Sequence, residues 1–292
     1  MKRTIKAGSR DSILAVIQSR IILELINKKV PELGTELVTM KTTGDKILDR
    51  TLDKVGGKGL FVKELDRALL SGEVDITIHS LKDLPADIPD GIKIAAYSER
   101  SAPEDVLILP EGKEELDHSL PIGCASKRRM AQLNILFPDI DIKPVRGNIQ
   151  TRLSKLDSGQ YGGLVLAKAG IVRLGLEKRI SREFTPEEIL PAAGQGIIAV
   201  ECREEDDFDF LEKINDYESS VCAAAERSFI CAMDGGCTSP SAAYCKVDGN
   251  SIVVTGMDVR DGKIIKKSVS GAASEAEKLG LELAKMIIGS DE

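Results

Sequence analysis

Residues 4–29 read TIKAGSRDSILAVIQSRIILELINKK, and their hydrophobic pattern changes part of the way along. TIKAG is a short apolar stretch, whereas from Ile13 to about Lys29 the apolar side chains recur at the spacing that places them on one face of a helix. The stretch therefore predicts a strand that is followed directly by a helix.

The same alternation continues through the first hundred residues. ELVTMKTT (36–43) has the β-branched side chains of a strand, a helix is expected over 60–71, and DITIHS (75–80) predicts another strand. The glycines of 56–59 predict a mobile loop between the second strand and the second helix. Strands that alternate with helices are typical of a mainly parallel sheet covered by helices.

A second alternation of this kind begins near residue 100. Strands are expected over 122–126, 141–147 and 162–167, with helices over about 128–136 and from Asn148 onward. In such sheets, ligands bind at the carboxyl ends of the strands, where helix N-termini offer free N–H groups to anions. The strand-to-helix junctions are therefore the first places to look for a site.

The pattern changes again at about residue 217. A helix is followed by a loop that contains a cysteine and then by three strands, separated by 248–250 (DGN) and 261–262 (DG), both strong hairpin signals. A last helix is expected over 273–288. This part of the chain predicts a separate antiparallel α/β domain.

Length and charge exclude several classes of protein. The 292 residues correspond to two or three domains. No apolar run approaches the ~20 residues needed to cross a bilayer, and the N-terminus lacks the continuous apolar region of a signal peptide, so a cytoplasmic protein is expected. A net charge of −7 argues against nucleic-acid binding, because such domains are usually basic.

The chain has six cysteines and only two histidines. It contains no C-x-x-C pair, so neither disulfides nor a zinc site is expected, and a histidine-activated nucleophile has little support. Five cysteines lie in strand or helix patterns, where buried thiols are expected. Cys237 lies instead in the bare loop DGGCTSPSAAYC (234–245), and from composition alone both a buried and a reactive thiol stay open. The other five are Cys124, Cys202, Cys222, Cys231 and Cys245.

Basic residues gather at the predicted strand-to-helix junctions. A single arginine there is usually solvated, but guanidinium groups also bind carboxylates and phosphates in a bidentate fork. Six basic residues in equivalent positions favour a site for a small polyanion. They are Arg10, Lys127, Arg128, Arg129, Arg146 and Arg152.

The segment HSLKDLP (79–85) places Lys82 and Asp83 directly after a predicted strand. Asp83 fits either of two roles. A polar cap or turn is the ordinary structural role of such a residue. A carboxylate at this edge also suits proton transfer or the stabilisation of a positive charge on a ligand.

Several segments resemble the porphobilinogen deaminase family, also called hydroxymethylbilane synthases. The resemblance spans residues 7–237 and is most specific in the KGLFVKEL and HSLKDLP segments. The matching stretches are AGSRDSILAVIQS, TTGD, KVGGKGLFVKELDRALLSGEVDITIHSLKDLP, RR at 128–129, VRGNIQTRL, LPAAGQG and GGC.

The resemblance implies an α/β protein of three domains. Two of them resemble the lobes of periplasmic binding proteins, with mainly parallel mixed sheets and a cleft between them, and the third is a C-terminal α/β domain with a three-stranded antiparallel sheet. The expected boundaries are 1–98, completed by about 195–215, for the first lobe, 99–194 for the second and 216–292 for the third domain.

The resemblance also implies a transferase of tetrapyrrole biosynthesis, the route to porphyrins and haem. Such an enzyme joins four porphobilinogen molecules into hydroxymethylbilane and releases ammonia at each addition. The product grows on a dipyrromethane cofactor that is attached by a thioether to Cys237. Asp83 matches the catalytic aspartate, which stabilises the cation that forms on the substrate when ammonia departs. The enzyme is expected to be a cytoplasmic monomer with no metal, nucleic acid or membrane partner.

Further site residues follow from the same resemblance. Cofactor-binding positions are Ser80, Lys82, Asp45, Ser126, Arg128, Arg129, Arg146 and Arg152. Substrate-binding positions are Ser9, Arg10, Gln18, Arg146 and Arg152. Lys54, Lys58 and Phe61 match a mobile loop that covers the site.

The chain departs from the family pattern in two places. Residues 123–127 read GCASK where the family usually has Gly-Thr-Ser-Ser-Leu, so two hydroxyls are missing at Cys124 and Ala125. Thr238-Ser239 stands where Gln-Val is more usual, which affects the packing expected around Cys237. The alternative functions are a non-catalytic, two-lobed binding protein for a small carboxylate and a cysteine hydrolase. The binding protein needs neither Asp83 nor Cys237, and the hydrolase is disfavoured because the chain has only two histidines.

Overall fold

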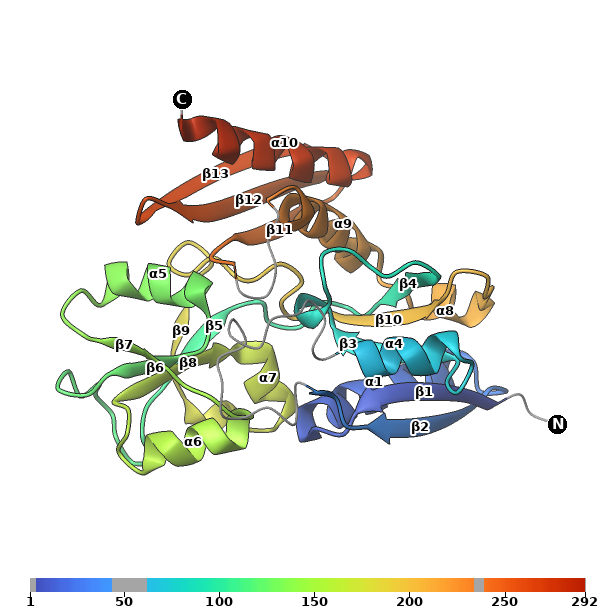
Figure 1. Ribbon diagram of the computed structural model, residues 1–292, viewed down its shortest axis with the longest axis horizontal. Coiled ribbons are helices and arrows are strands. Elements are labelled where there is room, and N and C mark those ends of the chain that lie inside the picture. Colours follow the sequence, from blue (N-terminus) through green and yellow to red (C-terminus); the bar gives the residue numbers. More distant parts are fainter. Residues whose placement is uncertain (1–3, 44–61, 234–238, 292) are drawn as a thin grey trace. The chain divides into compact units, whose positions relative to one another are not determined.

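The computed structural model describes residues 4–43, 62–233 and 239–291. The chain divides into two compact units, Met1–Ser101 with Ile197–Val221 and Ala102–Gly196 with Cys222–Glu292 (Figure 1). The chain therefore leaves the first unit after Ser101 and returns to it at Ile197.

The first unit is built on a five-stranded mixed sheet in the order β2-β1-β3-β10-β4. β1 is parallel to β2 and β3, whereas β10 is antiparallel to both of its neighbours. Ile5, Ile26 and Val200 belong to the apolar core that the sheet shares with α1 and α8. The elements are β1 (Thr4–Arg10), α1 (Ile13–Lys29), β2 (Gly34–Met40), α4 (Lys63–Leu70), β3 (Ile76–Ser80), η1 (Leu81–Asp83), β4 (Ile92–Tyr97), β10 (Ile198–Arg203) and α8 (Asp209–Ile214).

The second unit contains a sheet of the same design, in the order β7-β6-β8-β5-β9. β6 is parallel to β7 and β8, and β5 runs antiparallel between β8 and β9. Apolar side chains fill both faces, with Ile122 and Phe184 in one core cluster and Ile108 and Leu164 in another. The elements are β5 (Asp105–Ile108), β6 (Ile122–Cys124), α5 (Lys127–Leu136), β7 (Ile142–Pro144), α6 (Ile149–Asp157), β8 (Gly163–Ala167), α7 (Lys168–Arg173), η2 (Glu177–Arg179) and β9 (Ile180–Phe184).

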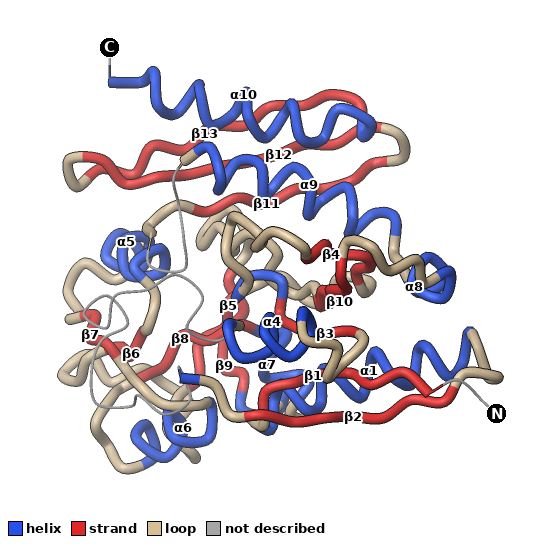
Figure 2. The backbone as a smooth tube through the Cα atoms, turned by 45° about the vertical axis from the view of Figure 1, so that its right-hand side comes forward, coloured by secondary structure: helices blue, strands red, loops and turns tan. Residues whose placement is uncertain are grey.

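The C-terminal part of the chain forms a three-stranded antiparallel sheet, β11-β12-β13. Helices α9 and α10 pack on the same face of this sheet, because a Cβ at Gly256 of β12 would meet both Phe229 and Leu283 within 3 Å (Figure 2). The hairpin at Asp261 turns through positive φ angles, as its sequence predicts. The elements are α9 (Tyr217–Ala232), β11 (Ala242–Asp248), β12 (Ser251–Arg260), β13 (Lys263–Ala272), η3 (Ala273–Glu275), α10 (Ala276–Ile288) and η4 (Gly289–Asp291).

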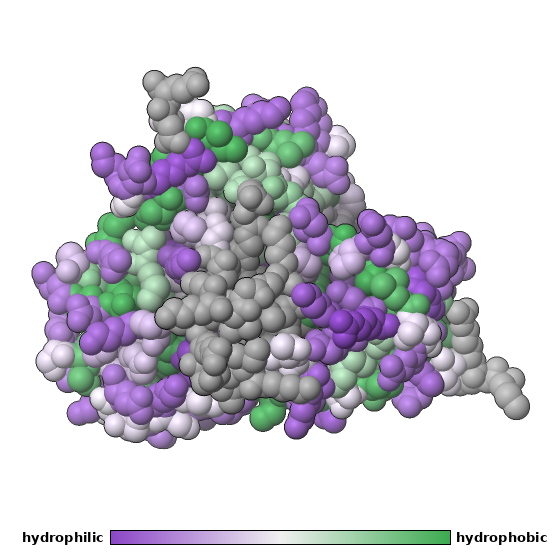
Figure 3. Space-filling model, in the orientation of Figure 1, coloured by the Kyte–Doolittle hydropathy of each residue, from purple (hydrophilic) through white to green (hydrophobic). Residues whose placement is uncertain are grey.

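The predicted α/β class, the two mixed sheets and the antiparallel C-terminal sheet are confirmed. The antiparallel strands β5 and β10 were not predicted, because their short apolar runs show neither strict alternation nor a turn signal. The three-domain division stays a prediction. None of the described helices is both long and apolar enough to cross a membrane. On the face seen in Figure 3, the described residues are mostly hydrophilic, with hydrophobic side chains in small separate patches, which agrees with a chain that is 30% charged.

Candidate functional site

The predicted site residues of the first unit meet at one edge of its sheet. β1 and β3 are parallel neighbours, with Ala7 opposite Ile76, so their carboxyl ends lie side by side. Ser9 and Arg10 end β1, and Ser80 ends β3. The buried Gln18 of α1 donates a hydrogen bond from Nε2 to Ser80 Oγ over 2.7 Å. Three of the predicted substrate positions and Ser80 are therefore assembled within this unit.

Asp83 ends the short 3₁₀ turn that follows β3. Leu81 and Leu84, at 2% and 5% exposure, anchor the turn in the core, so the half-buried Asp83 has little freedom to move. Among the residues that the structure describes, none hydrogen-bonds or ion-pairs with its carboxylate. Within residues 4–43, 62–233 and 239–291, Asp83 therefore takes part in neither a side-chain cap nor an ion pair.

A second set of charged side chains is buried in the first unit next to β3. His79 Nε2 lies 3.2 Å from Glu201 Oε2, and both side chains are nearly inaccessible to solvent. Burial, together with the charges of Glu201 and Glu64, raises the pKa of Asp66 to about 6. This set carries more acidic than basic groups.

The predicted residues of the second unit lie at the carboxyl ends of β6 and β7. These strands are parallel, with Cys124 opposite Pro144, so Ser126 and Arg146 follow neighbouring strand ends. Arg152 donates from Nε to the carbonyl of Gly147 over 2.8 Å. Gly147 has a φ of +110°, and a Cβ there would lie 2.6 Å from Thr151, so the turn that presents Arg152 requires glycine.

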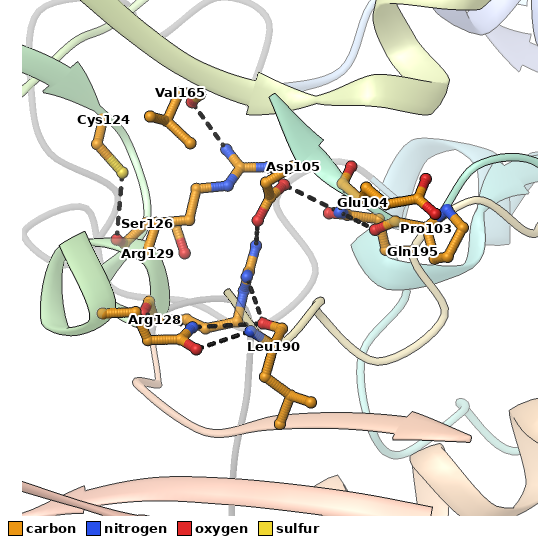
Figure 4. Close-up of polar contacts among 11 residues, drawn as sticks. Pro103, Glu104, Asp105, Cys124, Ser126, Arg128, Arg129, Val165, Leu190 and Gln195 are labelled. Carbon is orange, nitrogen blue, oxygen red and sulfur yellow. Dashed lines mark hydrogen bonds and ion pairs between the residues drawn. The ribbon is translucent and has the colours of Figure 1, made fainter. Parts of the chain in front are cut away.

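Arg128 and Arg129 are buried around a carboxylate that the sequence did not single out. Asp105 at the start of β5 is fully buried, and its two oxygens lie 2.8 Å from Arg128 Nη2 and 2.7 Å from Arg129 Nη2 (Figure 4). The side chain of Gln195 donates to the same carboxylate over 2.9 Å. Burial alone would raise the pKa of Asp105, but the two guanidinium groups more than offset it and hold the pKa well below its usual range.

The Asp105 cluster, defined as Asp105, Arg128, Arg129 and Gln195, carries two cationic side chains and one anionic side chain. Among the described residues, Arg129 Nε is a buried donor with no hydrogen-bond partner. A buried positive charge in excess and an unused N–H are costly unless a further anion binds. The cluster therefore suits a ligand that carries carboxylates.

Two further residues of this unit were missed by sequence reasoning. Glu226 of α9 is fully buried and accepts hydrogen bonds from the backbone N–H of Gly194, over 2.6 Å, and of Cys245, over 2.7 Å. It thereby fixes the loop that carries Gln195. Arg173 ends α7, and burial lowers the pKa of its guanidinium to about 10. The signal for Arg173 was its place in the helix that directly follows the strand GGLVLA, as Arg152 lies in the helix that follows β7.

Some predicted positions lie outside the described residues. These are Cys237, Asp45, Lys54, Lys58 and Phe61, so their roles stay predictions. Among the other cysteines, Cys124, Cys202, Cys222 and Cys245 are buried as predicted, but Cys231 is exposed. The burial expected for Cys231 was wrong, because this residue lies in the last turn of α9, where its side chain is exposed. No three potential metal ligands cluster within the described part of the chain.

Two family models match the chain. "Porphobilinogen deaminase, dipyromethane cofactor binding domain" matches residues 5–209, and "Porphobilinogen deaminase, C-terminal domain" matches residues 220–289.

Curated relatives match over nearly the whole length. Porphobilinogen deaminase of Acetivibrio thermocellus is 54% identical over 98% of this chain and 99% of that protein. The proteins of the same name from Alkaliphilus oremlandii and Ruminiclostridium cellulolyticum are 50% and 51% identical over at least 97% of each chain. Among solved structures, the methionine-binding protein MetQ covers 77% of this chain and 91% of its own at 13% identity, with a TM-score of 0.45, which is too low to assign a fold.

Proposed function

The chain belongs to the porphobilinogen deaminase family, and we propose that it polymerises four porphobilinogen molecules into the linear tetrapyrrole hydroxymethylbilane on a covalent dipyrromethane primer. Each addition forms one carbon–carbon bond, breaks one carbon–nitrogen bond and releases ammonia. The match to a cofactor-binding family model favours this transferase function over a non-catalytic binding protein.

The observation that carries the proposal is the Asp105 cluster. Dipyrromethane bears acetate and propionate groups, and the cluster offers a buried positive charge in excess and an unused N–H on Arg129. Guanidinium groups are the side chains best suited to carboxylates in a desolvated place. The bound cofactor supplies the pyrrole carbon to which new units are added. Ser126, Arg146 and Arg152, from the same edge of the sheet, bind further carboxylates in this proposal.

Asp83 is the catalytic residue in this proposal. Its carboxylate hydrogen-bonds the pyrrole N–H groups, assists the departure of ammonia and stabilises the positive charge that develops as the carbon–nitrogen bond breaks. The support is its fixed position on a short turn and the lack of any partner for it among the described residues. Ser9, Arg10 and Gln18 orient the incoming substrate, while Ser80 and Lys82 contact the cofactor.

The remaining assignments rest on the family alone. Cys237 forms the thioether, Asp45 binds the cofactor, and Lys54, Lys58 and Phe61 belong to a loop that excludes water. The domains are 1–98 with about 195–215, 99–194 and 216–292. The protein works as a cytoplasmic monomer on porphobilinogen, with no metal, nucleic-acid or membrane partner. The free cysteines of the described residues suit a reducing compartment.

One experiment tests the function and the role of Asp83 together. The purified protein is expected to carry an adduct of two porphobilinogen units, each less ammonia, by intact mass, and to convert added porphobilinogen to hydroxymethylbilane. Asp83→Asn is expected to keep the adduct and to lose roughly 10²–10⁴-fold in turnover, the usual range for a group that moves or stabilises charge. Asp90→Asn, an exposed carboxylate a few residues away, is the matched control.

Three outcomes contradict the proposal at different points. Wild-type protein that makes no hydroxymethylbilane refutes the function. An unmodified mass in protein that does turn over refutes the covalent primer. Normal turnover by Asp83→Asn refutes the catalytic assignment and leaves the function intact.

A further inference from the structure

Asp105 contacts both arginines of its cluster with separate oxygens. Oδ1 accepts from Arg129 Nη2 over 2.7 Å, and Oδ2 lies 2.8 Å from Arg128 Nη2. Each guanidinium is also fixed at a second point, because Arg128 Nη1 donates to the carbonyl of Leu190 over 2.6 Å and Arg129 Nη1 donates to that of Val165 over 3.3 Å. Two contacts to a planar fork define its orientation.

The carboxylate itself is held from the opposite side. Gln195 Nε2 donates to Asp105 Oδ1 over 2.9 Å and to the carbonyl of Pro103 over 2.6 Å. The backbone N–H of Leu190 in turn donates to Gln132 Oε1 over 2.7 Å. Asp105 is therefore the central, immobile acceptor of a network that ties β5, α5 and the loop before β10 together (Figure 4).

Such a carboxylate has two possible effects on an anionic ligand, and they have opposite signs. As a negative charge beside two arginines, it lowers the local positive potential and weakens anion binding. As a fixed acceptor, it holds two flexible side chains in one orientation and removes the ordering cost of binding. The geometry favours the second effect, since all the described contacts of Asp105 restrict the two guanidinium groups or Asp105 itself.

We propose that Asp105 is a positioning residue, which acts through Arg128 and Arg129 to preorganise them for the carboxylates of the cofactor. This inference rests on the proposed function, and it assigns to Asp105 a role distinct from any contact with the cofactor. It predicts that the removal of this negative charge weakens the capture of an anionic ligand, although the local charge becomes more positive.

The test measures cofactor assembly rather than turnover. Protein produced without porphobilinogen is mixed with increasing porphobilinogen, and the appearance of the adduct is followed by intact mass. Asp105→Asn keeps the shape of the side chain, but its amide can accept from only one guanidinium and presents a donor to the other. The half-saturating porphobilinogen concentration for adduct formation is expected to rise at least tenfold, with a maximal rate within threefold of wild type.

Two more variants separate orientation from charge and from stability. Arg129→Lys keeps the charge but removes the fork, and it is expected to raise the half-saturating concentration by a similar factor. Val106→Ala truncates a fully buried side chain at the next position of the same strand and serves as the stability control. It is expected to lower the melting temperature without changing the half-saturating concentration.

Each other result overturns the inference. Adduct formation by Asp105→Asn that is as efficient as in wild type, or more so, shows that Asp105 only neutralises charge. Unchanged capture by Arg129→Lys shows that fork orientation is irrelevant. An equal loss in Val106→Ala shows that general destabilisation explains the result. Wild-type protein that forms no adduct refutes the proposed function, and this inference falls with it.

Discussion

Two sheets with the same strand order bury different kinds of charge. In the first unit, Glu201 of the antiparallel strand β10 faces His79, a residue that is cationic only when it is protonated. In the second unit, Asp105 of the antiparallel strand β5 faces two arginines that stay charged at any physiological pH. The His79–Glu201 pair is therefore a conditional ion pair, whereas the pairs of Asp105 with Arg128 and Arg129 contain permanently charged cations.

The two units differ in whether a proton can neutralise their excess buried charge. The first unit has an excess of acidic groups, and it responds by favouring the protonated form of Asp66. The second unit has an excess of arginine, which does not release a proton, so the surplus remains until an anion binds. The surplus of buried arginine in the second unit therefore agrees with the proposed site for an anionic ligand.

The largest effect is expected from Asp105→Leu, which breaks the permanent pair. It leaves two buried guanidinium groups without a carboxylate and is expected to cost about 3–5 kcal/mol in the free energy of unfolding. Because the pKa of Asp105 is lowered in the folded state, its contribution is complete above the unfolded value of about 4 and declines as the pH falls below it. Urea unfolding of cofactor-free wild type and Asp105→Leu from pH 3 to pH 8 measures the difference in their free energies of unfolding. A difference that becomes larger toward acid pH would contradict the prediction.

A smaller effect is expected from Glu201→Gln, which tests the conditional pair. The amide retains an acceptor for Thr77, which lies 3.3 Å from the carboxylate, and it leaves no permanent charge unpaired. The expected loss is about 1–3 kcal/mol, the usual cost of impairing one buried polar contact. A loss as large as that of Asp105→Leu in the same urea experiment would remove the distinction between the two units.

The smallest effect, with the opposite sign, is expected from Asp66→Asn. The folded state raises the pKa of Asp66 from 3.8 to about 6, so ionisation of Asp66 destabilises the fold increasingly between these values and fully above pH 6. The amide is therefore expected to stabilise the protein by about 1–2 kcal/mol at pH 7–8, after allowance for solvent at this half-buried site, and by nothing below pH 4. Glu73→Gln, an exposed acid of the same unit, is the control and is expected to show no such gain.

The features predicted correctly are those that depend on residues close together in the sequence. The helix from Ile13, the hairpin at Asp261 and the strand that ends at Ser80 each follow from a local pattern, and all three are present in the structure. The Asp105 cluster could not be found in this way. Asp105 only begins an apolar run, and its partners Arg128 and Gln195 lie far along the chain in segments that show no relation to it.

The exposure of residues was also beyond local reasoning. Arg128 and Arg129 occupy a helix start, where arginine is normally solvated, yet they are 3% and 6% exposed because β5 brings a carboxylate beneath them. For Cys231 the error is in the opposite direction. The apolar pattern of its helix predicts burial, but its side chain is exposed. The family resemblance implied a cofactor-binding role for both arginines, but it did not indicate that they are buried.

The hydrogen bonds of Glu226 have a consequence for the order of events during synthesis. They join the backbone of residues 194 and 245 through a side chain at residue 226, so the complete pair of hydrogen bonds requires β11 to have been made. At roughly 5–20 residues per second, the ribosome needs roughly 3–10 s to travel from one end of this link to the other. During that interval Glu226 lacks its hydrogen bond from Cys245, so the loop that carries Gln195 is only partly anchored. The complete network around Arg128 and Arg129 therefore forms only after β11 has been synthesised.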